Sequence, residues 1–219
     1  MRVLLLCVLL ALASAPAEGR AVSCHCFRDR SFDPARPAAA DPYVLATVQN
    51  SVMASAFGIE KRSVVQAKMT GTANEDLWLA HFVGAKSGLS APELLDARAR
   101  SGNWADALDR LGVRPERVGG ELNGVLRRGS PDAVLASAVV DAAASERLGA
   151  APEAVQALRS AGATDAETLA AVLLARVAGS EPAAFLASVR SGASTWGELF
   201  HRAGVELTAI GDEVARRIR

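Results

Sequence analysis

Aromatic residues are scarce in this chain. One tyrosine, three tryptophans and six phenylalanines bring the aromatic fraction to only 5% of the 219 residues. Strands are enriched in aromatic and β-branched side chains, and alternating apolar and polar runs of strand length are missing from this sequence. Alanine, in contrast, is abundant, and small side chains allow short helices to pack closely. The sequence therefore predicts an all-α fold.

The chain also has no net charge. The chain has 24 basic and 24 acidic residues, so its formal net charge is zero. A basic excess would indicate nucleic acid as a partner, and an acidic tail would indicate a basic partner. The balance therefore predicts no nucleic-acid partner and leaves an unidentified protein partner as the alternative.

Long hydrophobic runs are absent after the N-terminus. The run at residues 3–13 follows Arg2 and is too short to span a bilayer comfortably. Ala15-Pro16-Ala17 then has the small-x-small pattern that signal peptidase recognises. We predict that residues 1–17 are a signal peptide, so the mature chain is exported to the periplasm or the extracellular space without a membrane span.

A lipid anchor is the alternative at this end of the chain. Residues 21–24, which end in Cys24, resemble a lipidation box. Such a box should directly follow the apolar run, but Glu18, Gly19 and Arg20 stand between them. This spacing disfavours lipidation and favours a soluble product.

Caps and helix-ending glycines divide the remaining chain into about a dozen short helices. Residues 18–40 are predicted to be an extended segment, and residues 41–219 a helical domain. Two capping boxes, Ser90 with Glu93 and Thr164 with Glu167, mark helix starts. Further helix starts are expected with Asp41 and Asn74 as N-caps, and one continuous helix is expected from Pro115 to Gly129.

The helical domain contains an internal duplication, with units at about residues 75–128 and 166–219. Residues 90–102 match residues 180–192, and Trp104 then matches Trp196. A repeated helical unit implies that each copy buries an apolar face against its neighbour, so the expected fold is an irregular stack of helices. Both tryptophans are predicted to be buried, near Leu95 and Phe185 respectively.

The motif Trp196-Gly197-Glu198-Leu199, followed by Gly204-Val205, resembles a motif of uncharacterised exported bacterial proteins. The block from Cys24 to Phe27 is similar to the start of the same proteins. The resemblance covers about half the chain and implies export, but no activity. Trp104-Ala105-Asp106 departs from the pattern at its second and third positions.

Cys24, His25 and Cys26 form the one suggestive chemical cluster. Cys7 leaves with the signal peptide, so these are the only cysteines of the mature chain. Two thiolates and an imidazole suit copper(I) or zinc, although the spacing differs from that of zinc ribbons and of covalent haem sites. A strained disulfide, an intermolecular disulfide and an unreactive tail are the alternatives.

The other histidines and the known catalytic motifs add little to this picture. His81 shares an apolar stripe with Trp78, which favours a histidine in or beside the core, and His201 could reach toward His25 as a ligand. The nucleophile elbow, the zinc-protease helix and the phosphate-binding glycine loop are absent from the sequence. We therefore expect a non-enzymatic interaction or structural protein, with a metal-binding or thiol-redox protein that uses Cys24, His25 and Cys26 as the alternative.

Overall fold

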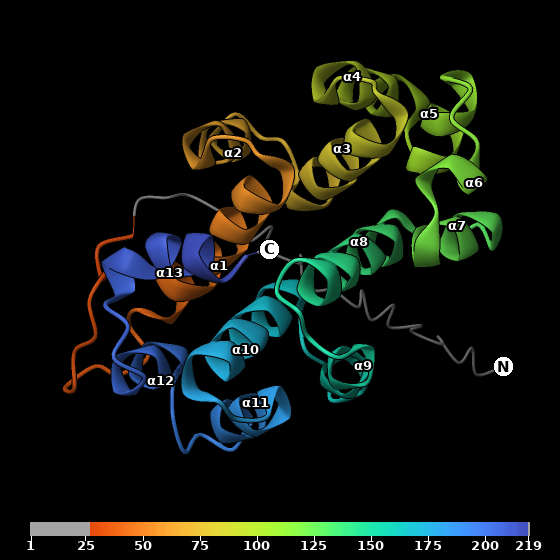
Figure 1. The fold of residues 1–219 in the computed structure, drawn as a ribbon. Coiled ribbons are helices and arrows are strands. Elements are labelled where there is room, and N and C mark those ends of the chain that lie inside the picture. Colours follow the sequence, from red (N-terminus) through yellow and green to blue (C-terminus); the bar gives the residue numbers. More distant parts are fainter. Residues whose placement is uncertain (1–26, 219) are drawn as a thin grey trace, which may run out of the picture.

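The structure, a computed structural model, describes residues 27–218 of the chain and is all-α. Thirteen α-helices and one short 3-10 helix make up this part, and no strand occurs among these residues (Figure 1). The predicted fold of about a dozen short helices is therefore confirmed. None of the described helices is long and apolar enough to cross a membrane.

The helices follow one another along the chain with short connections. Their bounds are α1 Asp41–Phe57, α2 Lys61–Met69, α3 Asn74–Ser87, α4 Ala91–Ser101, α5 Trp104–Arg110, α6 Pro115–Val118, α7 Gly120–Arg127, α8 Asp132–Glu146, α9 Pro152–Ser160, α10 Asp165–Ala178, α11 Pro182–Arg190, α12 Trp196–Arg202, η1 Leu207–Ala209 and α13 Ile210–Arg217.

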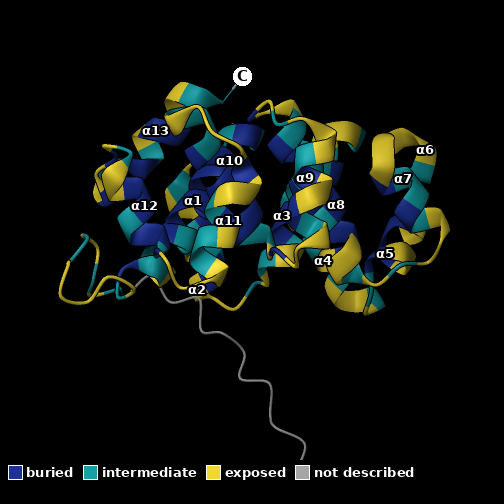
Figure 2. Ribbon diagram, turned by 90° about the horizontal axis from the view of Figure 1, so that it is seen from below, coloured by how far each residue is buried: buried dark blue, intermediate teal, exposed yellow. Residues whose placement is uncertain are grey.

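Four longer helices, α1, α3, α8 and α10, form the interior, and the shorter helices surround them. α1 packs against α10 and α13, while α8 packs against α3 and α7. The buried surface is concentrated on the inward faces of these four helices, and much of the exposed surface lies on the outer short helices (Figure 2). α1 therefore packs mainly against helices from the second half of the chain.

The two predicted capping boxes are present, but two of the predicted N-caps are wrong. Asp41 is the first residue of α1, and Ala40 occupies the cap position. The carboxylate of Asp41 instead accepts a hydrogen bond of 2.8 Å from the backbone N–H of Gly197. Asn74 is likewise the first residue of α3, after Ala73. For Asp41 the reason is its tertiary partner Gly197, which the local sequence does not show.

The expected helix from Pro115 to Gly129 is in fact two helices. Gly119 has a φ of 67°, a left-handed conformation that glycine adopts without steric cost. This residue ends α6 and allows α7 to begin at Gly120 in a new direction. The pair of adjacent glycines was the signal for this break.

The tryptophans are core residues, as predicted. Trp104 is 0% exposed and Trp196 is 2% exposed, and Trp78 is also fully buried. Leu95 and Phe185, which were expected beside the first two, are partly buried and pack against the same core. The few large aromatic residues therefore anchor the short helices, while alanines fill much of the remaining interior.

Candidate functional site

The predicted metal cluster Cys24, His25 and Cys26 lies outside the described residues, and so does the predicted signal peptide. The description begins directly after this cluster, at Phe27, whose ring packs edge-on against Tyr43 of α1 at 5.9 Å. Among the residues of known placement, no group of three or more His, Cys, Asp or Glu side chains could hold a metal ion.

The segment that follows the cluster lies along α1 and α12. The ring of Phe32 stacks on His201 of α12 with centroids 4.9 Å apart. The hydroxyl of Thr195 donates a 2.8 Å hydrogen bond to the carbonyl of Pro37. The imidazole of His201 thus takes part in holding the N-terminal segment against the end of the helical domain.

His81 is half-buried beside the core, in agreement with its predicted structural place. Its ring stacks on Phe57 with centroids 5.9 Å apart. Burial lowers the pKa of His81, which favours the neutral imidazole. Phe57 also packs edge-on against Trp78 at 5.7 Å, so these side chains form one aromatic cluster between α1 and α3.

Interior carboxylates connect helices that are distant in sequence. Asp76 of α3 accepts a 2.7 Å hydrogen bond from the indole Nε1 of Trp104, and Asp132 of α8 accepts a 3.1 Å hydrogen bond from its backbone N–H. Arg98 of α4 pairs with both carboxylates, at N–O distances of 3.2 and 2.8 Å. Two acids and one arginine thus join α3, α4, α5 and α8.

A second charged cluster joins α8, α9 and α10. The guanidinium of Arg159 donates to Asp141 and to Asp165, each at 2.6 Å, and Ser137 donates to Asp165 at 2.9 Å. Burial opposes the charge on Arg159, but the two carboxylates outweigh it and raise the pKa of this residue. Burial also raises the pKa of Asp141, although Arg159 opposes that shift.

Lys68 of α2 is the most deeply buried cation among the described residues. It is 7% exposed, and its ammonium donates a 2.5 Å hydrogen bond to the side-chain oxygen of Asn50. Burial lowers the pKa of Lys68 to about 8, because a neutral amide stabilises the charge less than a carboxylate would, and Glu75 opposes the shift only in part.

Because of Lys68, the free energy of unfolding is expected to rise with pH in the alkaline range. Its pKa is about 8 in the folded chain and 10.5 ordinarily, so the folded state loses the proton first. Below pH 8 the cost of burying the charge is fully present, and it is relieved as the pH rises from 8 to 10.5. The free energy of unfolding of the wild type should therefore rise by about 3 kcal/mol across this interval relative to Lys68→Met. Urea unfolding at pH 7.5 and pH 10.5 measures this difference. Parallel curves for the two proteins would contradict it.

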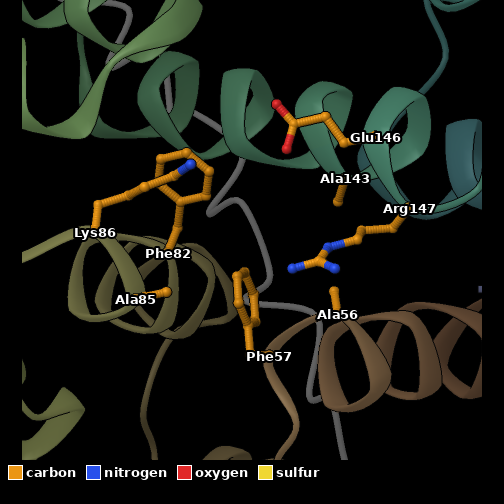
Figure 3. A pocket seen from close by; sticks show the side chains of 8 residues that line it. All are labelled: Ala56, Phe57, Phe82, Ala85, Lys86, Ala143, Glu146 and Arg147. Atoms are coloured by element: carbon orange, nitrogen blue, oxygen red, sulfur yellow. The ribbon is translucent and has the colours of Figure 1, made fainter. Parts of the chain in front are cut away.

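One small surface hollow lies where α1, α3 and α8 meet. It has a volume of about 50 Å³. It is lined by Ala56 and Phe57 of α1, by Phe82, Ala85 and Lys86 of α3, by Ala143 and Glu146 of α8, and by Arg147 directly after α8 (Figure 3). The ammonium of Lys86 lies over the ring of Phe82, 5.5 Å from its centroid. The floor of the hollow is therefore aromatic and aliphatic, and its rim is charged.

These arrangements were outside the reach of the sequence reasoning, which had selected only Cys24, His25 and Cys26 as site residues. The residues of the hollow and of the charged clusters come from helices that are far apart in the chain, and no local motif connects them. Comparisons with known proteins found no matching family model, no matching curated protein and no matching solved structure.

Proposed function

We propose that the chain is an exported, non-enzymatic helical-repeat protein that acts by binding another protein. The observation that carries this proposal is that partly buried aspartates connect the helices through ion pairs and hydrogen bonds. Asp76, Asp132, Asp141 and Asp165 are each paired with an arginine or with a helix start. Such pairs fix helices relative to one another. A rigid scaffold with a small surface hollow suits recognition better than it suits chemistry on a small molecule.

The repeat is proposed to be larger than the sequence comparison indicated, with one copy in α1–α7 and the other in α8–α13. Three glycines with positive φ recur at a spacing of 91 residues, as the pairs Gly58 and Gly149, Gly71 and Gly162, and Gly88 and Gly179. The same spacing aligns α1 with α8, α2 with α9 and α3 with α10.

Interactions recur at matching positions in the two copies. Asp41, at the start of α1, accepts a hydrogen bond from the backbone N–H of Gly197 in the first turn of α12. Asp132, at the start of α8, accepts a hydrogen bond from the backbone N–H of Trp104 at the start of α5. Lys68 with Asn50 likewise corresponds to Arg159 with Asp141. In this view the first helix of each copy packs against the third helix of the other, α1 on α10 and α8 on α3.

The binding role is tested by native mass spectrometry of the protein isolated gently from the exported fraction of its own cells. We expect the chain in a complex of fixed stoichiometry with a second protein. The opposing result is a chain that is always isolated alone and that converts a small-molecule substrate.

The alternative is a metal-binding or thiol-redox role for Cys24, His25 and Cys26. If this alternative holds, the purified reduced protein should contain near-stoichiometric copper or zinc, because two thiolates and an imidazole are soft-metal ligands. Elemental analysis measures it, and a variant with both cysteines replaced by serine should lose the metal. A wild type without metal, or a double variant that retains it, would eliminate this alternative.

A further inference from the structure

We propose that the hollow between α1, α3 and α8 binds a short acidic segment of a protein partner, which inserts one aliphatic side chain next to a carboxylate. This inference rests on the proposed binding function and specifies the partner's chemistry. It follows from the origin of the hollow, its size and the charges at its rim.

The hollow exists because Ala85 stands where the other copy has an arginine. With the spacing of 91 residues, Ala85 of α3 corresponds to Arg176 of α10, and Phe57 corresponds to Leu148. The side chain of Arg176 reaches from α10 to the residues that follow α8, where it donates a hydrogen bond to the carbonyl of Leu148. At Ala85 the side chain ends at Cβ, and the corresponding space is open.

The size of the hollow selects a single side chain as the guest. A water molecule needs roughly 10–15 Å³ of such volume, so about 50 Å³ holds about four non-hydrogen atoms. This is the size of a leucine or valine side chain, whereas pockets for cofactors and drug-sized ligands are typically about 300–1,000 Å³. The rings of Phe57 and Phe82, with the alanine methyl groups, offer an apolar surface for it (Figure 3).

The rim of the hollow favours a negative charge beside that side chain. Lys86 and Arg147 contribute two cations, and Glu146 contributes one anion. All three side chains belong to exposed residues, so their field acts on an approaching segment and attracts an acidic one. An aliphatic residue adjacent to aspartate or glutamate is the simplest segment that satisfies both features.

The test is selection from a displayed library of random peptides on the immobilised, full-length mature protein. We expect enrichment of peptides with leucine, valine or isoleucine next to aspartate or glutamate. Synthetic copies of the enriched peptides should bind Ala85→Arg at least tenfold more weakly, because the longer side chain occupies the space that Ala85 leaves open. Ala184→Arg is the matched control, since Ala184 is an exposed helical alanine on α11, and it should bind as the wild type does.

A double substitution, Lys86→Glu with Arg147→Glu, checks the charge without filling the hollow, and it should shift the selection toward basic peptides. The proposal is overturned if no peptide is enriched, if the enriched peptides are basic, or if Ala85→Arg binds them unchanged while its circular dichroism matches the wild type. If these results accompany a stable complex in native mass spectrometry, only the site is wrong. If the complex is absent as well, the proposed function fails.

Discussion

Replacing Trp104 or Trp196 with alanine should lower the free energy of unfolding by about 3–5 kcal/mol, the usual cost of truncating a large buried aromatic side chain. Trp104 is 0% exposed and Trp196 is 2% exposed, so each truncation leaves a cavity in the core. Trp104→Ala also removes the donor to Asp76 and should lie toward the upper end of the range. Urea unfolding followed by circular dichroism measures both variants.

The control for these variants is Met69→Ala. Met69 is 61% exposed, and surface substitutions usually change stability by less than about 0.5 kcal/mol. If the tryptophan variants unfold at the same urea concentration as the Met69 variant, the indoles do not anchor the helices. A role of these tryptophans in binding a partner would then be the explanation to test.

Arg159→Met should cost roughly 1.5–3 kcal/mol at pH 7, because it removes charged hydrogen bonds and leaves two partly buried carboxylates without their partner. Asp141 and Asp165 both point at this guanidinium at 2.6 Å, and without it they repel each other. The loss should shrink as the pH falls toward 4, since burial raises the pKa of Asp141 and its protonation removes part of the uncompensated charge. Thermal melts of wild type and variant at pH 7 and pH 4 measure the effect.

Lys68→Met is the matched comparison, because Lys68 has the corresponding position in the proposed first copy. Its partner Asn50 carries no charge, so we expect a change within about 1.5 kcal/mol of the wild type at pH 7. Equal losses for the Lys68 and Arg159 variants would mean that the charge of the partner side chain does not determine the loss, and the distinction between the two sites would be wrong.

Local signals allowed much of the secondary structure to be predicted. The capping boxes at Ser90 and Thr164 begin α4 and α10, and Asn103 caps α5 by accepting from the backbone N–H of Asp106. Caps and glycines act within one helical turn, so they can be read from adjacent residues. Asp41 was misassigned because its hydrogen-bond partner, Gly197, is supplied by the tertiary structure.

The candidate site could not be predicted in the same way. Phe57 lies in α1, Ala85 in α3 and Arg147 directly after α8, and nothing in their local sequence indicates that they meet. The comparison of units 75–128 and 166–219 was guided by the tryptophans. It did not extend to α1 and α2 with α8 and α9, because buried positions there differ, with Val44 opposite Leu135 and Met53 opposite Ala144.

We propose that the two copies hold each other as one scaffold, and cutting the chain between them tests this arrangement. A protease recognition sequence inserted after Gly129, in the exposed turn between α7 and α8, allows the folded full-length protein to be cleaved. Size-exclusion chromatography with light scattering then measures the mass. We predict that the two fragments elute together at the mass of the uncut chain, because α1 packs on α10 and α8 packs on α3. Separation into two species with the masses of the individual fragments would contradict this arrangement.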